Sequence, residues 1–377
     1  MSALDTAGND LNSPFLDAIR SVRPDLPQYL EDAIRAVPRH AYLPGADLDD
    51  ASDPTLVPGL LQQLDVTPGD TILEIGAGTG YSAALLSTLS GGGKVVTVGI
   101  DREMSDRAAG NLAANGVANV EVLTAGDSCG DPKERVFDRL ISTVGAWDVL
   151  SAWWRQVRPG GWMVLPLRLR GTTCTVALEH CGTDLVSSGA EPCGPVPVMG
   201  ETGERSADID PWGRARLYWD VDQDVDPVAL LGVLDSEPIR TDTGVTTGPE
   251  AFDRVWLRLA ATDPATCRIE VTPEGVEAGL AGPAVPVRTA CLAEGSSVAY
   301  LTFRRRDAEA PTGELGVAAH GPDAAALTQR LTAVIAAWGK DRTNIPEFTV
   351  YPATTPLAEL PPGNVITKRD SHVIITY

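Results

Sequence analysis

The 377-residue sequence is poor in basic residues and has no long apolar run. It contains 30 lysines and arginines against 51 aspartates and glutamates, a formal net charge of -21. So acidic a chain is not expected to bind nucleic acid, whose phosphates attract basic surfaces. No stretch approaches the roughly 20 apolar residues of a membrane-spanning helix, so no membrane interaction is expected. The N-terminus lacks the basic and apolar regions of a signal peptide, which favours a cytoplasmic protein.

Cysteine and histidine are also scarce. The six cysteines include no Cys-x-x-Cys pair, and the four histidines stand far apart in the sequence. Protein ligands for zinc and similar metals usually recur at short, regular spacings. We therefore expect free thiols and no metal site.

The length indicates two domains, because a single core rarely grows beyond roughly 250 residues. In residues 71–167, short apolar strands alternate with helical segments, which is typical of a parallel, doubly wound α/β sheet. The expected strands are Thr71–Ile75, Lys94–Val98, Val120–Leu123, Asp138–Ser142 and Trp162–Leu167. A Rossmann-like first domain over residues 1–200 is therefore predicted.

The pattern changes after Arg170. The segment Gly182–Gly200 is rich in Gly, Pro and Ser, which indicates the end of the first domain. Strand-like segments then predominate, among them Val255–Ala260, and one amphipathic helix is expected at Ala324–Trp338. The sequence thus predicts an α+β second domain over residues 201–377.

A glycine-rich loop follows the first expected strand, with the spacing Glu74-x-Gly76-x-Gly78-x-Gly80. Glycine lets the backbone turn sharply and lets a ligand lie against it without an intervening Cβ. A dinucleotide fingerprint would require glycine at position 81, where this chain has Tyr81. The pattern instead resembles motif I of class I S-adenosylmethionine-dependent methyltransferases, in which a carboxylate before the loop lies near the methionine part of the cofactor.

Later segments extend this resemblance. Ala125-Gly126-Asp127 follows the third expected strand, where the superfamily places an acidic residue near the adenine, and Arg158-Pro159-Gly160-Gly161 precedes the fifth. The resemblance implies S-adenosyl-L-methionine as the cofactor. It also implies a binding site formed by Glu74, Gly76, Ala77, Gly78, Thr79, Gly80, Gly99, Ile100, Asp101, Gly126 and Asp127.

The segments Val37–Pro44 and Pro68–Tyr81 resemble those of protein-L-isoaspartate O-methyltransferases, and this likeness covers about residues 10–200. The whole chain is more similar to a long actinobacterial branch, the FxLD-system methyltransferases, through Thr143–Trp147 and Leu360–Arg369. Members of that branch methylate an aspartate side chain of a ribosomally made precursor peptide, and the ester closes to an aspartimide that persists or hydrolyses to isoaspartate. The resemblance implies this activity and a precursor peptide as partner, but no oligomeric state.

Two departures from the family pattern leave roles open. The acidic residue that usually holds the ribose aligns with Gly99, so either Asp101 replaces it or ribose binding is weakened. Only seven residues separate Pro44 from Ser52-Asp53-Pro54, where relatives have a longer segment that forms a lid over the ligand. By resemblance Ser52 is the active-site hydroxyl, although a turn or helix-capping serine is an equal alternative.

The implied reaction depends on orientation more than on acid–base groups. A carboxylate with an ordinary pKa of about 3.9 is already ionised at neutral pH, so the enzyme must align it with the methyl group and exclude water. Ser52 and Thr143 are the predicted catalytic residues, though Thr143 could equally be a strand-end residue satisfied by backbone. Three functions stay open: peptide aspartate methylation with recognition by the second domain, isoaspartate repair, and non-catalytic peptide binding.

Overall fold

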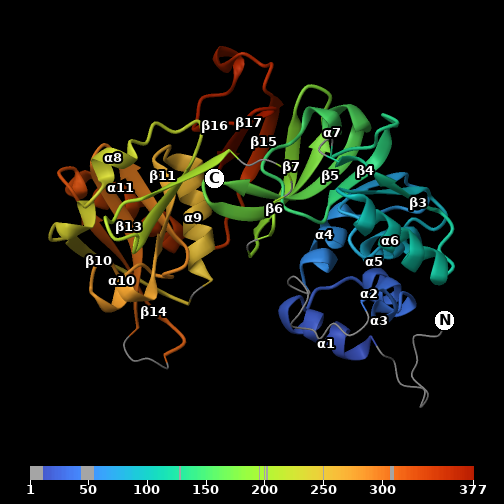
Figure 1. The fold of residues 1–377 in the computed structure, drawn as a ribbon, viewed down its shortest axis with the longest axis horizontal. Coiled ribbons are helices and arrows are strands. Elements are labelled where there is room, and N and C mark those ends of the chain that lie inside the picture. Colours follow the sequence, from blue (N-terminus) through green and yellow to red (C-terminus); the bar gives the residue numbers. More distant parts are fainter. Residues whose placement is uncertain are drawn as a thin grey trace. The chain divides into compact units, whose positions relative to one another are not determined.

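A computed structural model describes residues 12–43, 55–126, 129–194, 196–198, 200, 203–248, 250–305 and 310–377. The chain forms two compact units, which Figure 1 draws with their elements labelled. The first unit comprises Met1–Leu167, Cys174–Gly200 and Phe348–Thr354, and the second comprises Arg168–Thr173, Glu201–Glu347 and Thr355–Tyr377. The chain therefore passes between the units more often than a single boundary after residue 200 would require.

The first unit is built on a sheet with a parallel core. Its strands pair in the order β3-β2-β1-β4-β5, and each of these pairs is parallel. The strands are β1 (Ile72–Ile75), β2 (Val95–Gly99), β3 (Val120–Thr124), β4 (Phe137–Ser142) and β5 (Val157–Leu169). The connecting helices are α5 (Tyr81–Leu89), α6 (Arg102–Ala114) and α7 (Ser151–Gln156). This alternation confirms the predicted doubly wound α/β class.

Three more strands extend this sheet beyond β5 in the order β6-β7-β15. They are β6 (Thr172–His180), β7 (Leu185–Pro192) and β15 (Glu347–Pro352), and β7 is antiparallel to both of its neighbours. Strand β7 lies inside the segment Gly182–Gly200, which the sequence indicated only as the end of a domain. Only Leu185 and Ala190 of this strand are buried, and the residues between them include two serines and a glycine, so the apolar signal is weak.

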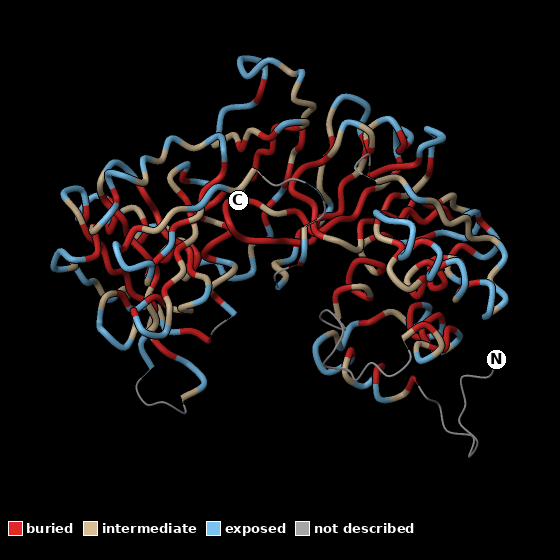
Figure 2. Tube along the Cα trace, viewed as in Figure 1, coloured by how far each residue is buried: buried red, intermediate tan, exposed pale blue. Residues whose placement is uncertain are grey.

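Four helices at the N-terminal side complete the first unit: α1 (Ser13–Val22), α2 (Gln28–Ala36), α3 (Arg39–Tyr42) and α4 (Leu56–Leu64). Their apolar stripes, such as Phe15, Leu16 and Ile19 of α1, share one core with α5 and the sheet. The Asn12 amide donates to the carbonyls of Ile34 and Val37, at 2.7 and 2.9 Å, which fixes α1 against the end of α2. Figure 2 draws the buried residues of this core in red.

The second unit is built on a seven-stranded sheet in the order β10-β14-β13-β12-β11-β9-β8, in which every pair is antiparallel. The strands are β8 (Glu204–Asp208), β9 (Ala215–Asp220), β10 (Ile239–Thr247), β11 (Thr266–Val271), β12 (Thr289–Glu294), β13 (Ser297–Arg305) and β14 (Gly313–His320). Successive residues point to opposite faces. In β12, Ala290 and Leu292 therefore join one core, and Cys291 and Ala293 join another.

Helices α9 (Ala251–Thr262) and α11 (Ala324–Lys340) cover one face of this sheet. The prediction of a helix at Ala324–Trp338 is confirmed, whereas the prediction of a strand at Val255–Ala260 is wrong. A short apolar run does not distinguish a strand from a buried helix, and here Ala251, Val255 and Leu259 recur at helical spacing and are buried. The remaining elements are α8 (Pro227–Leu230), η2 (Val233–Asp235), α10 (Pro273–Glu277), η3 (Leu357–Glu359), β16 (Val365–Thr367) and β17 (Ser371–Thr376).

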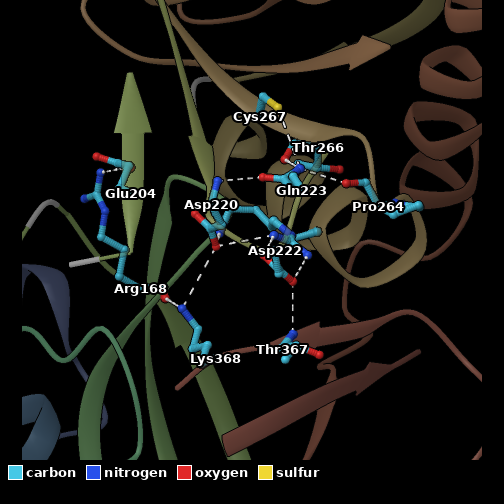
Figure 3. A network of polar contacts seen from close by, with 12 residues as sticks. Arg168, Glu204, Asp220, Asp222, Gln223, Pro264, Thr266, Cys267, Thr367 and Lys368 are labelled. Carbon is cyan, nitrogen blue, oxygen red and sulfur yellow. Dashed lines mark hydrogen bonds and ion pairs between the residues drawn. The ribbon is translucent and has the colours of Figure 1, made fainter. Parts of the chain in front are cut away.

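A buried polar network of the second unit joins Arg168 at the end of β5 with the segments that follow β9 and β16 (Figure 3). The Lys368 ammonium donates to the carbonyl of Arg168 at 3.0 Å and lies 4.0 Å from a carboxylate oxygen of Asp220. Thr367 N–H donates to Asp222, at 3.0 Å. Burial raises the pKa of Asp220 and the charge of Lys368 lowers it. Lys368, part of the late motif Leu360–Arg369, therefore has a structural role inside this unit.

Candidate functional site

The first unit contains a cavity of about 410 Å³ at the carboxyl ends of its parallel strands. It lies where the strand order reverses on either side of β1, and in open α/β sheets ligands bind at this position. A volume of this size suits a small-molecule ligand. Seven residues of the predicted site line it: Gly76, Ala77, Gly78, Thr79, Gly99, Ile100 and Thr143.

The loop after β1 needs its glycines. Gly76, Gly78 and Gly80 all have positive φ angles, of 107°, 48° and 85°, which side chains rarely tolerate. A Cβ on Gly76 would lie 2.7 Å from the hydroxyl oxygen of Thr143. Gly80 does not line the cavity; a Cβ there would lie 3.1 Å from the carbonyl oxygen of Ala108, so it lets α5 begin close to α6. The loop thus exposes bare backbone to the cavity.

Glu74 is the carboxylate before this loop, and it is completely buried. Neither of its carboxylate oxygens has a hydrogen-bond partner in the described part of the chain. Burial raises its pKa to about 7, although the nearby hydroxyls of Ser82 and Thr97 act in the opposite direction. An uncompensated buried carboxylate is costly, and a cationic ligand group would stabilise its charged form. Glu74 itself does not line the cavity, but the neighbouring Ser82 does, and the pairing of Glu74 with the ammonium group of S-adenosylmethionine stays a prediction.

Gly99, the position where the family resemblance places an acidic residue, has little space for a side chain. A Cβ at Gly99 would lie 2.4 Å from the hydroxyl oxygen of Ser105, so that serine occupies the space of a larger residue at position 99. Asp101 caps α6, where its carboxylate accepts a hydrogen bond from the Met104 amide at 2.8 Å. Ile100 and Met104 line the cavity, but Asp101 does not. The ribose role of Asp101 stays a prediction, and its carboxylate already has a structural partner.

The other predicted residues differ in how far the structure describes them. Ser52 and Asp127 lie outside the described residues. Gly126 has a φ of 53° and does not line the cavity. Thr143 does, and its hydroxyl lies 3.1 Å from the carbonyl of Gly76 and 3.3 Å from that of Ile75. Backbone therefore satisfies its proton, as the strand-end interpretation requires, and its catalytic role stays a prediction.

An aromatic wall of the cavity was missed in the sequence. Phe15 and Tyr81 line it, with ring centroids 6.5 Å apart, and Tyr42 packs against Tyr81 at 5.9 Å. Arg39, from α3, also lines the cavity. These residues come from three segments, and the periodicity of α1 marks Phe15 only as core. The segments Val37–Pro44 and Pro68–Tyr81, which carried the family resemblance, were the one available signal for Arg39 and Tyr81.

The described residues contain neither a cluster of potential metal ligands nor a helix that could span a membrane. No group of three or more His, Cys, Asp or Glu side chains there is placed to hold a metal ion. No helix in the same part of the chain is both long and apolar enough to cross a membrane. Cys174, Cys267 and Cys291 form no disulfide and are buried, which raises the pKa of each thiol.

The chain has clear relatives among known proteins. Residues 28–202 match the family model described as protein-L-isoaspartate(D-aspartate) O-methyltransferase. The protein-L-isoaspartate O-methyltransferase of Methanopyrus kandleri is 34% identical over 190 residues, which cover 46% of this chain and 84% of that protein. The enzyme of the same name from Methanococcoides burtonii is 33% identical over 192 residues, covering 47% of this chain and 94% of that protein.

A solved structure with the same name covers 96% of this chain and 98% of its own, at 15% identity and a TM-score of 0.49. The sequence relatives are matched over most of their own length and at more than 30% identity. The chain therefore belongs to the protein-L-isoaspartate O-methyltransferase family, whose members are S-adenosylmethionine-dependent carboxyl O-methyltransferases.

Proposed function

We propose that this enzyme methylates an aspartate side chain of a ribosomally made precursor peptide, and that the ester then closes to an aspartimide. One observation carries the proposal. The relatives from Methanopyrus kandleri and Methanococcoides burtonii are matched almost completely by less than half of this chain. What remains is a second unit with a sheet and a core on each face. A unit that these relatives lack is available to recognise a particular peptide.

The residues of the first unit can supply binding and orientation. S-adenosylmethionine, when bound, provides a methyl group on a positively charged sulfur. The bare backbone of Gly76–Gly80 can accept the cofactor closely, and the buried Glu74 carboxylate can pair with its ammonium group. The lining is largely aromatic and aliphatic, and such a lining would displace water from around a bound acceptor and so favour methyl transfer over side reactions. The acceptor carboxylate needs no general base, because it is ionised at neutral pH.

Closure to the aspartimide requires no further catalytic group. The backbone nitrogen that follows the esterified aspartate attacks the ester carbonyl, a new C–N bond forms, and methanol leaves with the proton of that nitrogen. The enzyme thus needs to hold the peptide long enough for one methyl transfer.

Mass spectrometry tests the proposal directly. The full chain is incubated with S-adenosylmethionine and a small precursor peptide encoded beside its gene. We expect a mass gain of one methyl group, followed by loss of methanol. A matched peptide in which the modified aspartate is replaced by asparagine should stay unchanged. An intact enzyme that binds cofactor and leaves the mass of the precursor unchanged would contradict the proposal.

Isoaspartate repair is the second candidate, and membership of the family favours it. A repair enzyme would methylate unrelated isoaspartyl peptides at similar rates, whatever their flanking sequence. The proposed peptide enzyme would instead prefer its precursor strongly over such peptides. A non-catalytic peptide-binding module is a third alternative. Calorimetry decides it, since micromolar binding of S-adenosylmethionine would remove its basis.

A further inference from the structure

One charged side chain that lines the cavity forms no ion pair in the described part of the chain. Arg39 is the only ionised side chain among the described residues that line the cavity, and it opens α3. Its guanidinium carbon lies 4.8 Å from the centroid of the Phe15 ring, which holds the side chain in place. Its backbone N–H bonds to the Asn12 side chain at 3.3 Å, but its guanidinium makes no hydrogen bond or ion pair within the described part of the chain.

Tyr81, which also lines the cavity, has a hydroxyl that donates no hydrogen bond in the described part of the chain. The side chain is 8% exposed, and its hydroxyl is buried without a hydrogen-bond partner in the described part of the chain. Burial raises the pKa of this phenol, and the charge of Arg39 opposes that rise. The hydroxyl therefore stays protonated at neutral pH. Phe15 lies against both side chains, since its ring centroid is 4.8 Å from the Arg39 guanidinium carbon and 6.5 Å from the Tyr81 ring centroid. A buried hydroxyl without a partner is unfavourable, so a ligand acceptor at this position would be stabilising.

We propose that the Arg39 guanidinium and the Tyr81 hydroxyl together bind a carboxylate inside the cavity. The planar guanidinium presents paired N–H donors that match the two oxygens of a carboxylate, and the phenol adds a third donor. No acidic side chain is among the described lining residues, so nothing there competes for the cation. In a protein of net charge -21, a carboxylate ligand depends on such a local cation, because the overall field repels it.

Two carboxylates could occupy this position, and they share the same chemistry. One is the carboxylate of the methyl acceptor, in which case the inference rests on the proposed function and identifies how the reacting group is held. The other is the α-carboxylate of the cofactor. The two sources are separable, because the cofactor product S-adenosylhomocysteine binds without any acceptor.

The test uses the full chain with Arg39→Gln, Arg39→Lys and Tyr81→Phe. Three quantities are measured: the Kd of S-adenosylhomocysteine by calorimetry without acceptor, and the KM and kcat for the acceptor peptide at saturating S-adenosylmethionine. A charge-assisted contact of this kind supports a loss of about 10- to 100-fold for Arg39→Gln. Arg39→Lys should recover part of that loss, and Tyr81→Phe should lose less than Arg39→Gln. The melting temperature of each variant checks that it is folded.

Arg342 supplies a matched control. Its guanidinium also stacks on an aromatic ring, 4.8 Å from the centroid of Trp338, but it belongs to the second unit and does not line the cavity. Arg342→Gln should leave both the Kd and the KM within about twofold of the wild type. A loss equal to that of Arg39→Gln would indicate a general effect of removing a stacked arginine and would overturn the inference.

The pattern of losses identifies the source. A raised KM with an unchanged Kd for S-adenosylhomocysteine assigns the pair to the acceptor carboxylate. A raised Kd assigns it to the cofactor, provided that an analogue of S-adenosylhomocysteine lacking the α-carboxylate binds wild type and Arg39→Gln equally. Both constants unchanged in a folded Arg39→Gln overturn the inference, as does an equal loss for the analogue.

Failure of the proposed function is recognised separately. If the wild type leaves the precursor unmodified but methylates isoaspartyl peptides, those peptides serve as the acceptor and the same two constants decide. If neither is methylated, the measurement with S-adenosylhomocysteine decides alone, and an unchanged Kd then overturns the inference.

Discussion

Glu74→Gln should stabilise the protein without cofactor and weaken its affinity for cofactor. The pKa of the buried Glu74 carboxyl is raised from 4.5 to about 7, a difference that corresponds to about 3 kcal/mol at roughly 1.36 kcal/mol per pKa unit. Because the pKa of Glu74 is higher in the folded state, the free energy of unfolding is not reduced by this carboxyl below pH 4.5 and falls as the pH rises to 7. Glutamine does not titrate, so the free energy of unfolding of Glu74→Gln does not fall in this way.

Urea unfolding at pH 4.5 and pH 8 measures the first half of this prediction. The variant should have about the same free energy of unfolding as the wild type at pH 4.5 and up to about 3 kcal/mol more at pH 8. Asp131 is a buried carboxylate of the opposite kind, because Arg135 pairs with it at 2.6 Å and its pKa is lowered. Asp131→Asn should therefore lower stability at pH 8 and leave cofactor affinity unchanged.

Calorimetry with S-adenosylhomocysteine measures the second half. Only the ionised carboxylate pairs with the ligand ammonium, and a group with a pKa of about 7 is ionised to about one tenth at pH 6. Wild-type affinity at pH 6 should therefore be about tenfold weaker than the affinity with Glu74 fully ionised. The affinity of Glu74→Gln should not change with pH, and at pH 7.5 it should be weaker than that of the wild type. Measurements stay below pH 7.5 because an α-amino group loses its proton near pH 7.7–8.0.

Two results would refute this reasoning. A Glu74→Gln variant that binds S-adenosylhomocysteine as tightly as the wild type at pH 7.5 would show that the carboxylate does not face the ammonium. A variant less stable than the wild type at pH 8 would show that Glu74 has protein partners that the structure lacks, and that its buried charge is already compensated.

Three further predictions concern backbone space, capping and the second unit. Gly76→Ala should abolish cofactor binding and cost about 2 kcal/mol or more of stability. Gly92 has a similar φ of 110° and no atom within 4 Å of an added Cβ, so Gly92→Ala should show only the cost of backbone strain. Calorimetry and thermal unfolding compare the two variants. Asp101→Ala should lose about 1 kcal/mol of stability as a helix cap and leave the Kd of S-adenosylhomocysteine within about twofold, and a large rise in that Kd would restore its ribose role. Lys368→Met should cost about 1–3 kcal/mol in urea unfolding because the buried Asp220 carboxylate loses its ammonium partner but keeps the Arg170 guanidinium at 3.6 Å, and an unchanged stability would contradict the network of Figure 3.

Most of the first unit was predictable because its local signals agree. Strands such as Ile72–Ile75 and Phe137–Ser142 combine apolar residues with nearby helical segments, and both start within one residue of the expected position. The second unit was less predictable. Strand β10, at Ile239–Thr247, alternates exposed and half-buried residues and carries little apolar signal. The segment Val255–Ala260 is apolar enough for a strand, and only its packing against the sheet selects the helix.

The residues of the candidate site were likewise predictable only in part. The glycine loop was predictable because a bare backbone requires one residue type in a fixed spacing. The role of Asp101 was not, because an aspartate after a strand can serve equally as a ribose ligand or as a helix cap, and the choice depends on where its side chain points. Arg39 and Tyr81 lie 42 positions apart in the sequence and line the same cavity only because α3 packs against α5, so no local pattern could place them together.

The late motif Leu360–Arg369 has to be interpreted with its structure in mind. Lys368 is buried, donates to the Arg168 carbonyl and lies beside Asp220, so it is not available to a peptide. Of this motif, Lys368 therefore stabilises the second unit and is not a substrate contact. If the second unit selects the peptide, it must do so through surface residues that are free to differ between relatives with different precursors. A net charge of -21 then favours basic segments of the peptide at that surface, while the acidic group to be methylated depends on the cation inside the first unit.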